Sequence, residues 1–383
     1  MRTLLRLKNV IFNAMQKGQK MDALTMKEKQ EIVSSLGTPR DLYERSYYQY
    51  VCQKKANSSN TMFKLFYLLL NIPAFFVIVF LLIKPFKLPI KTASNNEIDA
   101  VCMFDEKLKD RIPVELSGKY NNMIFAKNTR CVLIKKDKKL LLKLWKKYPI
   151  SFNFLLKNML KIGEYRFCLC RFNSIKTFIT ASEYSYTSSF MTEFCNKNNV
   201  KHINVMHGES VFELTKTFFC YDECYVWDEF YITLYSSMGA CKKQFIVAIP
   251  PCLKFADVDA SQRVQYKYYM QSQTKTQMAK IKSILEKITD NYMVRPHPLY
   301  TDIRSLKEIF DEQRIESCDI PISESIMENR YIMAWDSTVL LQGYLNGKST
   351  IIDDITNPIR SKSMEDGYIM ADKGMKLSQV LRS

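Results

Sequence analysis

Histidine is scarce in this chain, with three occurrences in 383 residues. The eleven cysteines are scattered and form no CxxC pair, and no histidine completes a zinc-binding set beside Cys220 and Cys224. We therefore expect no metal site and no cofactor. The Cys168-Leu169-Cys170 run looks like part of a buried strand, so the cysteines are interpreted as reduced core residues of a protein in a reducing cytoplasm.

Acidic residues are few relative to basic ones: 39 against 56, which gives a net charge of +17. Such a surface favours an anionic partner, either anionic lipid or a phosphate-bearing substrate. The sequence lacks zinc-finger spacing, an aromatic RNA-binding signature and a basic helix placed for a groove, so we expect no nucleic acid partner. It also shows no secretory signal, and we expect the chain to keep its N-terminus.

One long uncharged run is present, Leu65–Ile83. At about 1.5 Å per helical residue it is long enough to cross a hydrocarbon core of about 30 Å. The alternative is a buried core helix, because Asn71 and Pro73 interrupt its first half. Lysines on both flanks give no orientation, and a segment broken at Pro73 could dip into the membrane and return. We expect attachment to the inner or plasma membrane at 65–91, after a basic helical region at 1–64, with the remaining domains cytoplasmic.

From residue 98 onward, short apolar runs alternate with helical stretches. The strands expected in a first domain at 98–245 are Ala100–Phe104, Arg130–Ile134, Phe167–Arg171, Thr177–Ala181 and His202–Met206. A second domain at 246–383 is expected to contain the strands Tyr292–Arg295, Tyr331–Trp335 and Thr350–Ile352, and the helices Met278–Thr289, Asp302–Gln313 and Val339–Leu345. This alternation predicts an α/β fold with two doubly wound, Rossmann-like domains. Ligands of such sheets bind at the carboxyl ends of the strands.

Two of the three histidines follow expected strands. His207 precedes Gly208, which allows a sharp turn, so the imidazole could project into a cleft and act as a general base. The alternative is a histidine satisfied by a backbone carbonyl at the strand end. Glu183 also follows a strand and could accept a proton from an acceptor hydroxyl, although a glutamate in the first turn of a helix explains it equally well. The third histidine, His202, is expected on the surface or in the core.

The second domain carries two further strand-end motifs. In Arg295-Pro296-His297-Pro298 the prolines stiffen the turn and fix the arginine and the imidazole in directions that suit a diphosphate. Between a strand and a helix lies Asp336-Ser337-Thr338, where the helix N-terminus forms a natural phosphate site. The alternative for Ser337 is a plain N-cap without ligand.

Taken in order, these three motifs resemble the GT-B glycosyltransferases, and in particular capsule and surface-polysaccharide transferases and CDP-glycerol glycerophosphotransferases. The resemblance covers about Ile98 to the C-terminus. It implies that His207 is the base and that Arg295, His297, Ser337 and Thr338 hold the donor phosphates. His207-Gly208 continues with Glu209-Ser210 rather than the Thr-Pro-Leu-Lys of the glycerophosphotransferases, which favours a sugar over a polyol phosphate.

The lysine-rich stretch Lys135–Lys161, with leucines and aromatic residues between the lysines, fits docking on an anionic leaflet. Its alternative is a solvated helix face packed by its leucines. The sequence therefore predicts a membrane-associated, metal-independent glycosyltransferase that moves a sugar from a nucleotide-sugar donor to a surface polysaccharide or lipid-linked glycan, as in capsule biosynthesis. The alternatives are a polyol-phosphate transferase and a noncatalytic nucleotide-binding regulator at the membrane.

Overall fold

The computed structural model describes residues 24–57, 61–89, 97–126, 129–172, 174–255, 264–364 and 367–382. Residues 1–23 of the basic N-terminal region and the last two residues of the expected membrane-attachment segment, 90 and 91, lie outside the described residues. The chain forms two compact units. Unit 1 comprises Met1–Lys109, Glu115–His207 and Phe212–Val247, and unit 2 comprises Asp110–Val114, Gly208–Val211 and Ala248–Ser383.

Unit 1 is built on a six-stranded sheet in the order β2-β1-β3-β4-β5-β6. Every pairing between these strands is parallel. The strands are short and mostly buried, as expected for a sheet covered by helices. They are β1 (Ala100–Cys102), β2 (Met123–Phe125), β3 (Thr177–Thr180), β4 (Lys201–Val205), β5 (Glu223–Val226) and β6 (Phe245–Val247).

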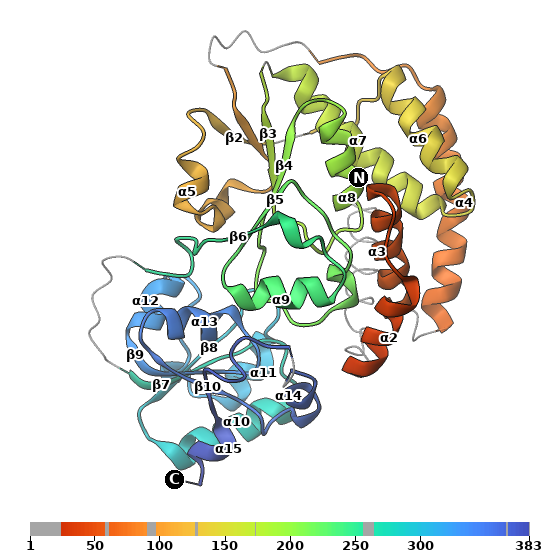
Figure 1. The fold of residues 1–383 in the computed structure, drawn as a ribbon. Coiled ribbons are helices and arrows are strands. Elements are labelled where there is room, and N and C mark those ends of the chain that lie inside the picture. The colour runs from red at the N-terminus through yellow and green to blue at the C-terminus, as the bar shows by residue number, and fades with distance from the viewer. Residues whose placement is uncertain are drawn as a thin grey trace. The chain divides into compact units, whose positions relative to one another are not determined.

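Several helices of unit 1 stack beside this sheet on the same side, among them α3, α4, α6 and α7 (Figure 1). Their apolar side chains form one core with the strands, in which Phe154, Leu155 and Phe178 are buried. The helices are α2 (Met26–Leu36), α3 (Leu42–Asn57), α4 (Thr61–Ile83), α5 (Val114–Ser117), α6 (Lys135–Lys147), α7 (Phe152–Arg171), α8 (Ser188–Asn196) and α9 (Glu229–Ser237), with 3-10 turns η1 (Glu106–Arg111), η2 (Leu214–Lys216) and η3 (Lys242–Gln244). The last two residues of η1 and the first residue of α5 belong to unit 2.

Two of the expected strands of the first domain are wrong. Phe167–Arg171 forms the last turn of the 20-residue helix α7, so Cys168-Leu169-Cys170 is helical. The run looked strand-like because it is short and apolar, but it continues the buried stripe of Leu155, Met159 and Ile162 at helical spacing. Arg130–Ile134 is irregular backbone that leads into α6.

The apolar run Leu65–Ile83 lies within the helix α4, which continues through Pro73. Across the described residues, no helix combines the length and the apolar run needed to cross a bilayer. The apolar membrane segment expected at 65–91 is therefore not found in the part of the chain that the structure describes. The described part of α4 packs one face on unit 1, where Ala74, Ile78 and Leu81 are buried.

Unit 2 contains a five-stranded sheet in the order β11-β10-β9-β7-β8, again parallel in every pairing. Figure 1 shows α12 and α13 on one side of this sheet and α10 on the other. The strands are β7 (Val264–Tyr269), β8 (Tyr292–Arg295), β9 (Asn329–Ala334), β10 (Ser349–Ile352) and β11 (Met375–Lys376). The helices are α10 (Lys275–Ile288), α11 (Ile303–Ile309), α12 (Ile322–Met327), α13 (Thr338–Leu345), α14 (Pro358–Met364) and α15 (Leu377–Val380), with the 3-10 turn η4 (Glu312–Arg314). Both units thus have the α/β, parallel-sheet architecture that the alternation predicted.

A glycine sets the distance between α13 and the sheet of unit 2. A Cβ atom at Gly343 would lie 2.5 Å from Ile332 Cδ1 and 3.2 Å from Thr350 Cγ2. Ile332 is on β9 and Thr350 is on β10, so the missing side chain allows the helix to approach both strands closely. This contact fixes α13, whose N-terminus carries Ser337 and Thr338.

Candidate functional site

The strand ends of unit 1 hold a small polar network. The carboxylate of Glu183, which follows β3, accepts hydrogen bonds from the His207 backbone N–H (3.0 Å) and from Asn204 Nδ2 (3.3 Å). The Asn204 oxygen in turn accepts from the Ser182 N–H (2.9 Å) and the Thr180 hydroxyl (3.2 Å). The backbones that follow β3 and β4 are therefore joined through two buried side chains.

Glu183 is 1% exposed, and both of its carboxylate oxygens have partners inside unit 1. A buried carboxylate engaged in this way is poorly placed to take a proton from a substrate hydroxyl. Its contacts describe a positioning residue that fixes the backbone of His207. The catalytic assignment of Glu183 stays a prediction that these contacts do not support.

His207, in contrast, is an exposed residue just beyond β4. Its ring lies 5.5 Å from the ring of Tyr184, centroid to centroid, in an edge-to-face arrangement. The chain leaves unit 1 at His207, because the next four residues, Gly208–Val211, belong to unit 2. Within unit 2 the Glu209 N–H donates to Thr338 Oγ1 at 3.3 Å.

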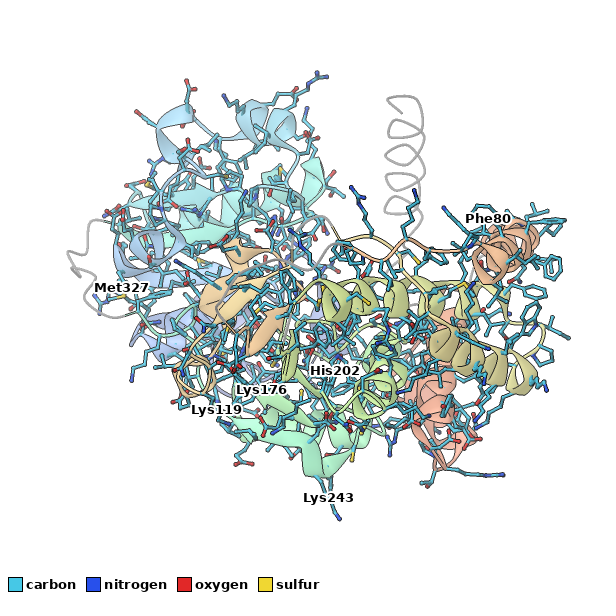
Figure 2. The ribbon with its side chains drawn as sticks, turned by 90° about the horizontal axis from the view of Figure 1, so that it is seen from above. Phe80, Lys119, Lys176, His202, Lys243 and Met327 are labelled. Carbon is cyan, nitrogen blue, oxygen red and sulfur yellow. The ribbon has the colours of Figure 1, made fainter. Side chains whose placement is uncertain are left out.

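The third histidine belongs to the core of unit 1, as Figure 2 shows. His202 Nδ1 lies 2.8 Å from Thr192 Oγ1, and Nε2 lies 3.2 Å from the Tyr165 hydroxyl. The Thr192 hydroxyl donates to the carbonyl of Cys220 (2.7 Å), so Nδ1 carries the ring proton and Nε2 accepts from Tyr165. Burial lowers the pKa of His202 to about 3, and the ring is neutral. The expected core role is the one observed.

In unit 2 the loops that follow β7, β8 and β9 are tied together by Gln271. Its carbonyl accepts from the Thr301 hydroxyl (2.9 Å), and Thr301 Oγ1 also accepts from the His297 N–H (2.8 Å). The Gln271 side chain donates to the carbonyl of Asp336 (2.9 Å). The His-Pro turn and the Asp336-Ser337-Thr338 segment therefore lie at the same edge of one sheet, as the sequence predicted for parallel strands. Gln271 itself had no signal in the sequence.

The His297 ring has a defined tautomer. Its Nδ1 accepts a hydrogen bond from the Leu299 N–H (3.1 Å), so in the neutral ring the proton sits on Nε2. Burial lowers the pKa of His297, which favours this neutral form near pH 7. The ring is partly buried and lies 4.4 Å from the Tyr300 ring. His297 can therefore present an N–H donor to an anion without carrying a full charge.

The surroundings of Arg295 differ from those expected of a phosphate ligand. The residue is 8% exposed, and its guanidinium donates from Nη1 to Glu316 (2.6 Å) and from Nη2 to the carbonyl of Ile320 (2.7 Å). Glu316 is also paired with Lys267, which is fully buried on β7. Because Arg295 is buried and both of its terminal nitrogens are bonded to the protein, these contacts do not support the phosphate-ligand prediction. The arginine instead holds the segment that follows η4.

Ser337 is the N-cap of α13, and its hydroxyl accepts from the Val339 N–H at 3.4 Å. This is the plain capping role weighed from the sequence, and it leaves room for a second role in binding. Thr338 begins the helix, and its hydroxyl receives the Glu209 N–H. Both residues are partly exposed at the positive end of the helix dipole.

A cation that the sequence analysis did not single out lies beside this helix. Arg360, on α14, pairs with Asp336 at 2.5 Å and lies 5.4 Å from the centre of the Trp335 ring. Asp336 therefore holds a positive charge at the edge that carries Ser337. The isolated Arg360 in Pro358-Ile359-Arg360 had no pattern that could have revealed it. Among the residues that the structure describes, no group of three or more metal-binding side chains is present.

No protein-family model and no curated protein sequence matches this chain. Comparison with solved structures gives the MnaA–UDP co-structure of S. aureus, with 9% identity and a TM-score of 0.44 over 67% of this chain and 78% of that one. Anabaena HepE in complex with UDP and glucose has 8% sequence identity and a TM-score of 0.38, over 75% of this chain and 98% of that one. The wall teichoic acid polymerase TagF has 10% sequence identity and a TM-score of 0.40, over 71% of this chain and 73% of that one. The fold class of this chain rests on its own two parallel sheets.

Proposed function

We propose that this chain is a glycosyltransferase that moves a sugar from a nucleotide-sugar donor to a glycan acceptor. One observation carries the proposal. At the carboxyl edge of the unit 2 sheet, Gln271 joins the loop of His297 to the segment that opens α13 with Ser337 and Thr338. The carboxyl edge of a parallel sheet is where such folds bind nucleotides.

The groups at this edge suit a phosphate. The Nε2–H of neutral His297 and the hydroxyls of Ser337 and Thr338 can donate hydrogen bonds to phosphate oxygens. The N-terminus of α13 adds a partial positive charge, and Arg360 adds a formal one, offset by Asp336. When the bond between the sugar and the donor phosphate breaks, the departing nucleotide gains negative charge, and donors already fixed in place stabilise it.

His207 is the proposed general base. In this step the proton of the acceptor hydroxyl passes to the imidazole, the acceptor oxygen bonds to the anomeric carbon, and the nucleotide leaves with the electrons of the broken bond. Glu183 supports this step by accepting a hydrogen bond from the His207 backbone N–H, which fixes the position of that residue.

The acceptor that we propose is a surface polysaccharide or a lipid-linked glycan, used at the cytoplasmic face of a membrane. The net charge of +17 and the exposed apolar side chains of α4, such as Phe76 and Phe80, support this location.

Donor binding tests the proposal directly. Purified protein titrated with UDP, GDP, CDP and CMP sugars should bind at least one of them with release of heat. His297→Ala should weaken that binding about 10- to 100-fold, because one hydrogen bond to a charged group is lost. Leu299→Ala is the matched control, since this side chain is 80% exposed in the same loop and its loss should leave binding unchanged. Folded protein that binds none of the donors would refute the proposal.

Product analysis then separates sugar transfer from polyol-phosphate transfer. A glycosidic linkage in the product supports our proposal, and a phosphodiester linkage replaces it with the alternative reaction. If the His207→Ala, His297→Ala double variant leaves the glycan of the cell surface unchanged, a noncatalytic regulator is the better description.

A further inference from the structure

The outer face of α4 is apolar and unusually exposed. Its large hydrophobic side chains are 38 to 76% exposed, and they run along the helix from Leu68 to Ile83. No charged residue lies between these two positions. The exposed members are Leu68, Leu69, Leu70, Ile72, Phe76, Val77, Phe80 and Ile83. Figure 2 shows Phe80 at the periphery of unit 1. We call these eight residues the α4 outer face.

The opposite face fixes α4 firmly on unit 1. Phe75 packs edge-on against Phe152 of α7 at 5.2 Å and against Trp145 of α6 at 6.2 Å. The Asn71 side chain accepts a hydrogen bond from the Asn153 N–H at 3.2 Å, near the start of α7. At the other end, Lys138 of α6 donates to the carbonyl of Leu82 at 2.6 Å. The α4 outer face is therefore a fixed part of the folded surface, and its apolar side chains meet solvent in the described structure.

The helix next to α4 is strongly basic. Seven of the 13 residues of α6 are lysines, and its single acid, Asp137, is buried in an ion pair with Arg166 of α7. The leucines Leu140, Leu141 and Leu144 point into the core, which leaves Lys139, Lys143 and Lys146 exposed. The alternative weighed for this lysine stretch, a helix packed by its leucines, thus describes one face of α6. Another face of α6, a helix that contacts α4 through Lys138 and Trp145, carries the exposed lysines.

The same combination continues at the end of α4. Lys84 lies 5.3 Å from the Phe80 ring and 5.8 Å from the Phe86 ring, and Lys87 and Leu88 that follow are exposed. An apolar strip bordered by lysines whose stems lie on aromatic rings is typical of a surface that sits at a membrane interface.

We infer that unit 1 docks on an anionic lipid surface through the α4 outer face, with α4 parallel to the plane of the membrane. The apolar strip lies along the side of the helix over about 24 Å, since 16 residues rise about 1.5 Å each, so the helix lies flat when the strip enters the interface. The lysines of α6 and the end of α4 then meet lipid phosphates. The inference concerns where the chain works and does not require the proposed chemistry.

The positive charge of the chain favours anionic lipid, rather than a second copy of the chain, as the partner that covers the α4 outer face. Each copy carries a net charge of +17, and pairing two copies through α4 brings their lysine-rich α6 helices into one assembly. Like charges oppose that pairing, whereas anionic headgroups neutralise the same lysines.

Vesicle flotation of the full chain, without any donor, tests the inference. The chain should float with phosphatidylcholine vesicles that contain phosphatidylglycerol, and much less with pure phosphatidylcholine, and salt should weaken the binding. Phe76→Ser with Phe80→Ser should lower partitioning more than about tenfold, because two inserted rings are lost. The matched control, Val114→Ser with Leu381→Ser, removes exposed apolar side chains of other elements and should bind like the parent chain.

A second pair of variants tests the charges. Lys143→Glu with Lys146→Glu should abolish flotation, whereas Lys242→Glu with Lys243→Glu makes the same change of charge in the exposed η3 turn and should have a much smaller effect. Flotation that is unchanged by the α6 pair, or lost equally with both pairs, would overturn the inference. So would a dimer in light scattering that the Phe76→Ser, Phe80→Ser variant abolishes in a chain that does not float.

Tryptophan depth measurements test the orientation. Leu69→Trp, Phe76→Trp and Ile83→Trp place an indole at the start, middle and end of the strip, and brominated lipids should quench all three at similar depth. A steady change of depth from Leu69 to Ile83 would refute the parallel orientation. Nucleotide titration of the Phe76→Ser, Phe80→Ser variant keeps the two proposals separate, because loss of lipid binding with intact donor binding contradicts neither.

Discussion

The substitution Glu316→Gln decides whether Arg295 is a scaffold or a ligand. Glu316 is buried and accepts hydrogen bonds from Arg295 (2.6 Å), from the Ser325 hydroxyl (2.5 Å) and from Lys267. Burial acts to raise the pKa of Glu316, but the hydrogen bonds from Lys267 and Ser325 outweigh it and hold the pKa below its usual value. The carboxylate is therefore charged at neutral pH and balances two buried cations.

Glutamine keeps the size of the side chain and removes its charge, which leaves Lys267 and Arg295 without their common anion. Breaking a buried ion pair by removing one partner costs about 3 to 5 kcal/mol. Two charge-assisted hydrogen bonds at about 1.5 to 3 kcal/mol each give a similar figure. A domain of this kind is stable by about 5 to 15 kcal/mol, so unit 2 should lose a large part of its stability.

Urea unfolding followed by circular dichroism measures the effect, and Glu308→Gln is the matched control because Glu308 pairs with Lys275 on the surface. That exposed pair should contribute less than about 1 kcal/mol. A loss below about 1 kcal/mol in Glu316→Gln would refute the scaffold interpretation. If, in addition, Arg295→Ala retained full stability and lost donor binding, the original phosphate-ligand prediction would be correct.

Three further predictions follow from single contacts. The pKa of His202 falls from about 6.5 unfolded to about 3 in the folded chain, so the buried neutral ring stabilises the fold above pH 6.5 and this contribution is lost as the pH falls towards 3. His202→Gln should flatten the pH dependence of the free energy of unfolding between these values, and an unchanged slope contradicts the assignment. Ser337→Ala should cost about 1 kcal/mol of stability by removing the cap of α13, and Ser337→Gly only a few tenths; equal losses in urea unfolding would show that the hydroxyl does not cap the helix. His207→Ala should lower kcat about 10²- to 10⁴-fold with little change in donor Kd, and a weakened Kd with unchanged kcat would show that His207 binds the donor instead.

The regular parts of unit 2 were the most predictable from the sequence. The strand Tyr292–Arg295 has the predicted bounds, and the helix expected at Val339–Leu345 begins one residue earlier. Local signals determine both elements, because each apolar run is bounded by a turn or a capping residue. The prediction of a strand at Phe167–Arg171 was wrong because the local signal there was misleading. Its short apolar run is the end of a long helix, and only the preceding turns show the helical spacing.

The partners that decide what the site residues do were not predictable. Glu316 lies 21 residues after Arg295, and Lys267 lies on a neighbouring strand, so no local pattern joins the three. Gln271 and Arg360 were missed for the same reason, since each acquires its role from strands and helices that meet only in the folded unit. The α4 outer face shows a related limit of periodicity. The apolar run predicts a helix. It does not predict which side of the helix is buried, because apolar residues occupy both sides and only the folded structure shows what packs against them.

The same division of roles appears at both strand-end motifs. Glu183 and Arg295 are charged, follow or end a strand, and were assigned to chemistry from the sequence, yet each is buried and bonded to the protein. The histidine near each of them is the more accessible group: His207 is exposed and His297 is partly exposed. Burying a charge is costly unless its partners are fixed, so a charge that is fully paired inside the fold stabilises the backbone that presents the next residue. The charged residue at each strand end thus orients a turn, and the neighbouring imidazole is the group that can meet a substrate.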